Sequence, residues 1–171
     1  MAKKIGFLGL VLFLSVFILI LSGCGKGVSE MAGEKAAEKI IEDRIGGQAN
    51  VDIDDGNVKI ETKDGNFETG KNIKLPSDFP RDVYVIEDNL TSAMSNQADG
   101  GFTISLETDK NVEEVSSIYQ NKLKGEGWKI TGTMNYEDSS SVIAEKDDRV
   151  VSVFASKNAD KTAVIIGIGK K

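Results

Sequence analysis

Carboxylates are the side chains in this 171-residue sequence that could most readily do acid–base chemistry, because histidine is absent and cysteine occurs once, as Cys24. Without histidine the chain lacks the common general base near neutral pH, the catalytic serine triad and the most frequent transition-metal ligand. With one cysteine it can form neither an internal disulfide nor a cysteine-based zinc site.

Three pairs of neighbouring carboxylates are the remaining candidates for catalysis. They are Glu113 and Glu114, Glu137 and Asp138, and Asp147 and Asp148. Adjacent residues point in different directions on a helix or strand, whereas glycoside hydrolysis needs two opposed carboxylates across a cleft. We therefore predict that the chain is not an enzyme and has no catalytic residues. A carboxylate-based hydrolase is the weaker alternative.

Two further motifs have part of the pattern of a ligand-binding loop. Gly65 to Lys71 has the glycine and lysine spacing of a phosphate-binding loop, but Asn72 stands where Ser or Thr is required, and Pro76 prevents a long helix beyond it. Asp52 to Asn57 is similar to a calcium loop but lacks the bidentate glutamate. We expect no nucleotide, no cofactor and no metal. A weak calcium site at Asp52 to Asn57 or at Glu145 to Asp148 stays an alternative.

Tyr119 and Trp128 are the aromatic residues that could line a binding site. We predict instead that both pack in the core, where a helix runs into a strand. The segment from Asn89 to Gly101 is long and polar and contains Leu90 and Met94. It is either a recognition loop or the turn region of a long hairpin.

The N-terminus has the pattern of an export signal. Two lysines precede a 17-residue apolar run, which ends in Leu21-Ser22-Gly23-Cys24. These four residues resemble the lipobox of bacterial lipoproteins. The resemblance implies cleavage between Gly23 and Cys24, removal of residues 1–23 as a signal peptide, and attachment of fatty acyl chains such as palmitate to Cys24. It places the mature chain on the extracytoplasmic side of a cell membrane, inner or outer.

A transmembrane anchor is the other interpretation of the same segment, because 17 apolar residues are close to the length that spans a bilayer. The small residues and the cysteine at its end favour the signal peptide. Removal of residues 1–23 leaves 19 basic and 27 acidic side chains, a net charge of −8. This acidic balance argues against nucleic acid as a partner.

The mature chain divides into a tether at residues 24–29 and two regions separated near Pro76. Residues 30–75 combine an amphipathic helix ending at Ile45 with a three-stranded meander at residues 50–70. We expect Glu38 and Glu42 on the solvent side of that helix. The apolar meander residues Val51, Ile53, Val58, Ile60 and Phe67 would share a face covered by the helix.

Residues 76–171 predict an α+β domain, a curved antiparallel sheet of about six strands in the order β-β-α-β-β-β-β with one helix packed on it. We expect strands at 83–86, 102–107, 128–136, 141–146, 149–155 and 162–168, and a helix at 112–124. The last strand is apolar at almost every position from Ala163 to Ile168, which predicts a central position with both faces covered.

The stretch Val112-Glu113-Glu114-Val115, followed by Tyr119, Leu123 and Gly127-Trp128, resembles a pattern in uncharacterised secreted and lipid-anchored bacterial proteins. The resemblance implies an envelope-facing domain and no known reaction. We therefore predict a lipid-anchored, non-enzymatic binding or interaction domain of the cell envelope, with an envelope protein as partner. An accessory binder of a small ligand or carbohydrate is the alternative.

Overall fold

The computed structural model describes residues 30–45, 47–54, 56–97 and 99–171, of which residues 34–171 form one compact unit. The predicted signal peptide, the lipobox with Cys24 and the tether lie outside these residues. Within the described ranges, no helix is both long enough and apolar enough to cross a membrane.

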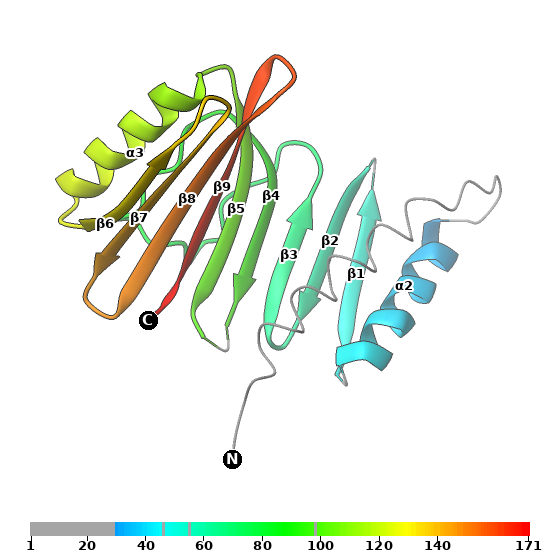
Figure 1. Ribbon diagram of the computed structural model, residues 1–171. Helices are drawn as coiled ribbons and strands as arrows, with labels where there is room; N and C mark the ends of the chain where they lie inside the picture. The colour runs from blue at the N-terminus through cyan, green and yellow to red at the C-terminus, as the bar shows by residue number, and fades with distance from the viewer. Residues whose placement is uncertain (1–29, 46, 55, 98) are drawn as a thin grey trace. The chain divides into compact units, whose positions relative to one another are not determined.

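The described strands form one nine-stranded sheet in which every neighbouring pair is antiparallel (Figure 1). Its strand order is β1-β2-β3-β4-β5-β9-β8-β7-β6. The strands are β1 (Ala49–Asp54), β2 (Asn57–Thr62), β3 (Gly65–Thr69), β4 (Asn89–Asn96), β5 (Gly101–Thr108), β6 (Lys129–Asn135), β7 (Ser139–Lys146), β8 (Arg149–Asn158) and β9 (Lys161–Lys170).

The predicted α+β class, with an antiparallel sheet and one helix packed on it, is confirmed, but the expected strand count is wrong. The meander does not end at β3, because Phe67 of β3 pairs with Met94 of β4 and the sheet continues across the region of Pro76. The predicted meander with its apolar residues on one face is confirmed, since Val51 pairs with Ile60 and Ile60 pairs with Phe67.

Two local predictions in the middle of the chain have different outcomes. The strand expected at 83–86 is wrong: this stretch is irregular, and a turn closed by the bond from the Val83 N–H to the Pro80 carbonyl leads into it. The segment from Asn89 to Gly101 is neither a loop nor only a turn, because residues 89–96 are strand β4, which pairs with β5 in a hairpin. Leu90 and Met94 lie on β4 and are half-buried.

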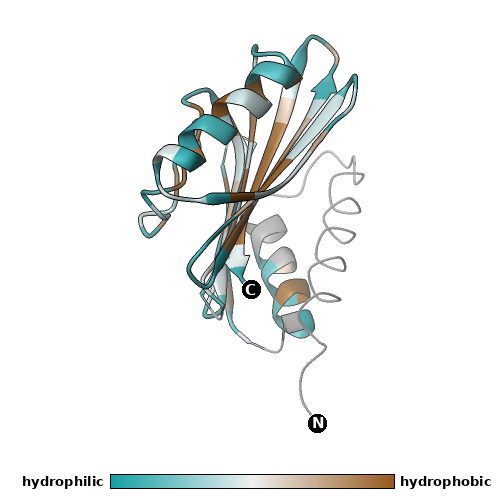
Figure 2. Cartoon of the chain, turned by 60° about the vertical axis from the view of Figure 1, so that its left-hand side comes forward, coloured by the Kyte–Doolittle hydropathy of each residue, from teal (hydrophilic) through white to brown (hydrophobic). Residues whose placement is uncertain are grey.

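Helix α3 (Val112–Gly125) packs against one face of the sheet, called here the inner face, where it contacts β6, β7 and β8. Asn111 begins the helix with a capping box, since its side chain accepts a hydrogen bond from the Glu114 N–H and the Glu114 carboxylate accepts one from the Asn111 N–H. Figure 2 shows the apolar strands behind this helix. The buried residues of α3 are Val112, Val115, Ser116, Tyr119 and Leu123.

The irregular segment Gly70–Asp88, called here the strap, covers more of the inner face. Phe79 makes an edge-on ring contact with Phe102 of β5, with centroids 5.5 Å apart. Ile73, Val83 and Ile86 are buried in the same core as α3. The strap therefore covers the inner face at β4 and β5, a role that a second helix has in many α+β sheets.

Helix α2 (Glu30–Ile45) lies against the other end of the sheet. Ile41 packs with Val51 and Ile60, as expected from the apolar stripe. The prediction that Glu38 and Glu42 face solvent is wrong, because their carboxylates accept hydrogen bonds from the Val51 and Ala49 N–H groups of β1. The helix thus covers the backbone edge of β1 with two acceptors.

The last strand, β9, is central, between β5 and β8, as predicted. The expectation that both of its faces are covered is wrong. Ile166 on the inner face is 0% exposed, whereas its neighbour Ile165 points to the opposite face, called here the outer face, and is 45% exposed. Side chains alternate between faces along a strand, so the exposed fractions of successive residues of β9 show which face of the sheet is covered.

Candidate functional site

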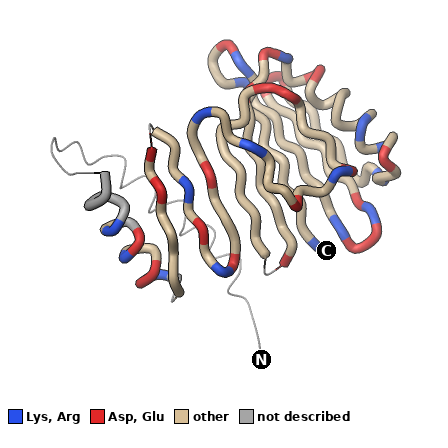
Figure 3. Tube along the Cα trace, turned by 180° about the vertical axis from the view of Figure 1, so that it is seen from behind, with Lys and Arg blue, Asp and Glu red and all other residues tan. Residues whose placement is uncertain are grey.

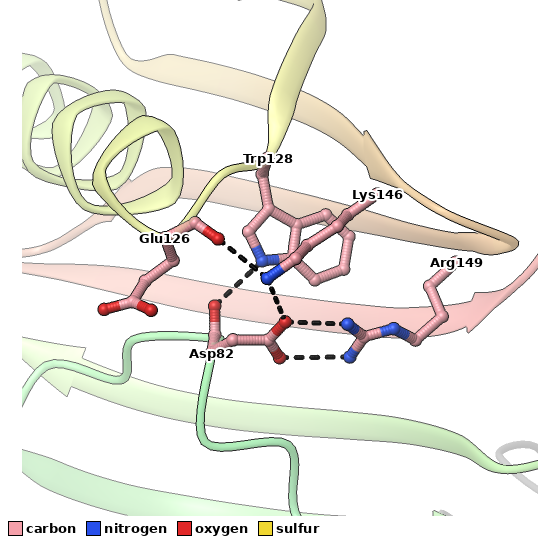
Figure 4. Close-up of polar contacts among 5 residues, drawn as sticks. All are labelled: Asp82, Glu126, Trp128, Lys146 and Arg149. Atoms are coloured by element: carbon pink, nitrogen blue, oxygen red, sulfur yellow. Dashed lines mark hydrogen bonds and ion pairs between the residues drawn. The ribbon is translucent and has the colours of Figure 1, made fainter.

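The strap is held at one point by a polar cluster around Asp82, called here the clasp (Figure 4). The Asp82 carboxylate receives two hydrogen bonds from the Arg149 guanidinium, at 3.0 and 2.7 Å. Lys146 Nζ donates a third at 2.8 Å. Both cations come from the β7–β8 hairpin, which places them together because Lys146 pairs with Arg149 in register. A bidentate guanidinium–carboxylate pair fixes geometry as well as distance.

Trp128 completes the clasp at the start of β6. Its indole Nε1 donates a 2.8 Å hydrogen bond to the backbone carbonyl of Asp82, and the Arg149 guanidinium lies 4.9 Å from its ring centroid. Lys146 Nζ also donates to the Glu126 carbonyl just after α3, at 2.7 Å. The clasp therefore ties together the strap, the end of α3 and the β7–β8 hairpin.

The electrostatics of the clasp favour the closed strap. Hydrogen bonds from Arg149 lower the pKa of Asp82 to about 2, against desolvation, which acts in the opposite direction. The same pair raises the pKa of Arg149. Asp82 is therefore ionised at neutral pH with its charge opposed by two cations. Such a carboxylate is a poor general base, so the arrangement serves attachment and not proton transfer.

Beneath the strap, Tyr119 of α3 is fully buried, with 0% of its surface exposed. Its ring lies 6.0 Å from that of Tyr84 on the strap. Burial raises the pKa of the Tyr119 phenol well above its usual range, and the nearby Ile86 N–H opposes this only in part. The Tyr119 hydroxyl makes no hydrogen bond of ordinary geometry with any described residue. A buried hydroxyl without a partner is a rare and destabilising feature.

The predictions for the aromatic residues are confirmed, since Tyr119 and Trp128 both pack in the core. Neither of the two surface depressions described below is lined by Trp128 or Tyr136, the lining that would favour the carbohydrate alternative. Trp128 is 3% exposed and engaged in the clasp, while Tyr136 is 70% exposed at the β6–β7 turn. Asp82, Lys146 and Arg149 were not predicted from the sequence, because their pairing joins positions more than sixty residues apart.

The carboxylate pairs lie at three separate places. Glu113 and Glu114 are in the first turn of α3, where Glu114 is engaged in the capping box. Glu137 and Asp138 lie in the β6–β7 turn, and Asp138 is 3.8 Å from Lys157. Asp147 and Asp148 form the β7–β8 turn. Within each pair the two residues are chain neighbours, so they do not face each other across a cleft.

The two loop-like motifs are parts of strands and turns. Gly65–Thr69 is strand β3, and the Lys71 N–H donates to the Asn57 side chain, so the segment does not open a helix. Asp52 and Asp54 lie on β1, and Asp55 lies outside the described residues. In the part of the chain that the structure describes, no group of three or more acidic or cysteine side chains is placed to hold a metal ion.

Two open depressions mark the described surface. One lies at the N-terminus of α3 and is lined by Lys110, Asn111, Glu113, Glu114, Ser117 and Ile118. The other lies where α2 meets β1 and β2, beside Glu42, Gln48 and Glu61. Neither is lined by a residue of the strap, and Tyr119 beneath the strap is 0% exposed, so the interior around Tyr119 is closed.

One comparison with known proteins gives a match. Residues 90–162 are similar to a START domain-like family. The matched part runs from β4 through α3 to the start of β9 and excludes the strap. Among curated proteins and solved structures nothing matches significantly. Families of this description usually bind ligands, so the match is compatible with a non-enzymatic binding domain.

Proposed function

We propose that the chain is a lipid-anchored, extracytoplasmic, non-enzymatic domain that binds a small, largely apolar ligand carrying one hydrogen-bond acceptor. The binding site is the space between α3, the strap and the inner face of the sheet. Two findings support the location. The family match covers α3 and the strands under it, and the strap that closes this layer lies outside the match.

The unpaired hydroxyl of Tyr119 is the observation that carries the proposal. The group is fully buried, and its raised pKa keeps it protonated, so it remains available as a donor. Its surroundings are apolar, with Val115, Leu123 and Ile86 in the same core. A ligand that brings a carbonyl or ether oxygen to this hydroxyl supplies the missing hydrogen bond, while its apolar part replaces buried strap side chains.

The ligand enters when the strap moves, because the interior is closed with the clasp formed. The apparent affinity therefore depends on the fraction of molecules in which the strap is open. Asp82 controls that fraction, since its carboxylate and carbonyl make the contacts to Arg149, Lys146 and Trp128. The site is thus gated, and Asp82 holds the gate closed.

Attachment through Cys24 is the second part of the proposal. The basic residues, the apolar run and the small residues before Cys24 support it. Metabolic labelling with a radioactive fatty acid tests it directly, with label expected in the natural chain and lost in Cys24→Ala. Label retained in that variant would exclude lipidation at this position. An envelope protein as partner stays a prediction from the sequence.

The ligand proposal is tested with the uncharged fluorophore 1-N-phenylnaphthylamine. We expect saturable binding to Asp82→Ala at least fivefold tighter than to the natural chain. Asp109→Ala is the matched control, because it removes an exposed ion pair with Lys161 away from the clasp. It should leave the affinity unchanged. Equal binding by both variants, or no saturable binding by either, would contradict the gated site.

Displacement of the fluorophore tests the role of Tyr119. In the Asp82→Ala background, 2-nonanone should displace it better than nonane, since only the ketone offers an acceptor to the hydroxyl. Adding Tyr119→Phe should abolish that preference while leaving binding of nonane intact. If the preference survives, the acceptor of the ligand is bound elsewhere.

A further inference from the structure

The outer face of the sheet carries two cross-strand rows without a charged residue. Residues paired in register lie on the same face, so the rows can be followed strand by strand from β4 to β6. The first row is Met94, Thr103, Gly167, Ser152, Ile143 and Gly132. The second row is Ser92, Ser105, Ile165, Phe154, Ser141 and Met134. We call the two rows together the open face.

The open face is accessible and partly apolar. None of its twelve residues is buried, and Met134, Phe154 and Ile165 are 52%, 45% and 45% exposed. Charged residues make up 28% of the chain, so about three would be expected among twelve accessible positions. Figure 3 shows charges on the helices, the turns and β1 to β3, and none along the middle of β4 to β9. Contiguous accessible apolar surface of this kind marks an interaction site.

The same rows continue toward β1, and there they are covered. Val51 and Ile60 lie in line with Phe67 and Met94, and Ile41 of α2 packs on them. The cover stops at the meander, because the cluster around Ile41 extends only to residues of β1, β2 and β3. From β4 onward the described chain provides no cover.

We propose that a second copy of this chain covers the open face, giving a two-fold symmetric dimer of sheets packed face to face. The mature chain carries a net charge of −8, so two copies repel each other, and a contact surface that itself holds no charge adds no like-charge pairs to that repulsion. A two-fold contact also brings the residues near its axis against their own copies, which like charges there would oppose. The open face is the part of the described sheet that meets both conditions.

The sizes of the side chains suit such a contact. Phe154 lies in its row between Ile165 and Ser141, and the neighbouring row places Gly167 and Ser152 beside it. The small residues on these sides of the ring leave room for a side chain of the partner when two sheets approach to about 10 Å. Five hydroxyl-bearing residues in the two rows can hydrogen-bond across the contact without introducing charge.

The strand order suits the same dimer. A two-fold axis between β9 and β8 places β6 of one copy opposite β4 of the other, since the order runs β4-β5-β9-β8-β7-β6. The dimer contact then ends just before β3, where the helix-covered part of the outer face begins. Helix α2 therefore limits the contact to the open face and does not obstruct it.

The test is cross-linking of the full chain in its own membrane. Ser152→Cys places a thiol in the open face, and Ser117→Cys places one on the exposed surface of α3 as the matched control. The natural chain, which has Cys24 alone, gives the background. With a short bis-maleimide we expect a product of twice the chain mass from Ser152→Cys, at least fivefold above that from Ser117→Cys. Phe154→Asp in the Ser152→Cys background should remove most of it.

The outcomes separate the possible occupants of the open face. A cross-linked product of another mass would overturn the proposal in favour of a different protein. Equal yields from the two cysteine variants, or a yield unaffected by Phe154→Asp in a chain that still unfolds cooperatively, would overturn it outright. The ligand site lies on the opposite face, so none of these outcomes bears on fluorophore binding.

Discussion

The two faces of the sheet differ in what covers them, and the covered side changes along the sheet. From β5 to β9 the inner face is apolar and lies beneath α3 and the strap. At β1 to β3 the inner face instead carries Asp52, Lys59 and Glu68, which pair in register and are accessible. There the apolar side chains are on the outer face, beneath α2.

Because the covered face changes along the sheet, this small sheet presents two different surfaces. A sheet with one core covers one face and solvates the other throughout its width. Here the apolar residues of the meander are on the outer face, and the rows they begin continue uncovered across β9 and β8. The inner face closes around Tyr119, and the outer face stays accessible around Phe154. We assign ligand binding to the first and self-association to the second.

Alanine substitutions of two neighbouring isoleucines on β9 should give the largest difference in the free energy of unfolding. Ile166→Ala removes a side chain that is 0% exposed and should lower the free energy of unfolding by about 3 kcal/mol. Ile165→Ala removes the same atoms from a 45% exposed position and should cost under about 1 kcal/mol. Urea unfolding at several chain concentrations measures both. A loss at Ile165 that grows with concentration reports the dimer, and equal losses at low concentration would contradict the difference between the faces.

Asp82→Asn should have the next largest effect, because it weakens the clasp. The pKa of Asp82 is about 2 in the folded chain and near 3.8 in the unfolded chain, so ionised Asp82 stabilises the fold above pH 4. The contribution is at most about 2 kcal/mol and is reduced by solvent access to the clasp. It disappears as the pH falls from about 4 to about 2.

Urea midpoints at pH 7, 4 and 2.5 measure this contribution. The difference between the natural chain and Asp82→Asn should be present in full at pH 7 and reduced to about a third of that value at pH 2.5. Asp109→Asn is the control, since its ion pair with Lys161 is exposed. A difference between the natural chain and Asp82→Asn that is the same at all three pH values would mean that packing of the strap, and not the charge, is what the substitution changes.

Tyr119→Phe should change stability less and in the opposite direction. The hydroxyl is buried without a partner, so its removal should raise the free energy of unfolding by about 1 kcal/mol. Thermal unfolding of the ligand-free chain is the measurement. Tyr84→Phe, on the half-buried strap ring that packs against Tyr119, is the matched control and should be near neutral. A destabilised Tyr119→Phe would show that the hydroxyl has a partner and would remove the main support for the ligand site.

Much of the fold follows from local patterns in the sequence. Alternating polar and apolar residues predict β5, a nearly continuous apolar run predicts β9, and a capping residue at Asp109 or Asn111 predicts the start of α3. The hairpin turns fix the neighbours of each strand in the meander and in β6 to β9. The strand expected at 83–86 is wrong because Val83 and Ile86 are buried, and Val85 half-buried, without pairing in the sheet, and apolar residues alone do not distinguish this from strand pairing.

The clasp could not be predicted, because its residues are far apart in the sequence and come together only in the folded chain. Lys146 and Arg149 look like the ends of an acidic turn, and Asp82 looks like one of many surface carboxylates. The change of the covered face at β4 is equally hidden. It depends on the pairing of β3 with β4 across the nineteen-residue strap. An irregular segment of that length does not determine which residues of the two strands pair.

Removal of the two acceptors at the β1 edge should have the smallest effect on stability. Glu38 and Glu42 bond the Val51 and Ala49 N–H groups, but water replaces these bonds at an exposed edge, so Glu38→Ala with Glu42→Ala should cost about 0.5 kcal/mol. Hydrogen exchange should accelerate at these two amides and remain unchanged in Asp43→Ala, an exposed position on the same helix. Unchanged exchange in the double variant would contradict the edge contact.

The same substitution also sharpens the difference between the two ends of the sheet. No described strand pairs with the outer edge of β6, whereas at the edge of β1 the Ala49 and Val51 N–H groups are occupied by α2. An exposed strand edge pairs readily with another chain. If association occurs through the open face, the double variant should leave the yield of the Ser152→Cys cross-link unchanged. A rise in that yield would place the contact at the β1 edge, since only that edge has been opened.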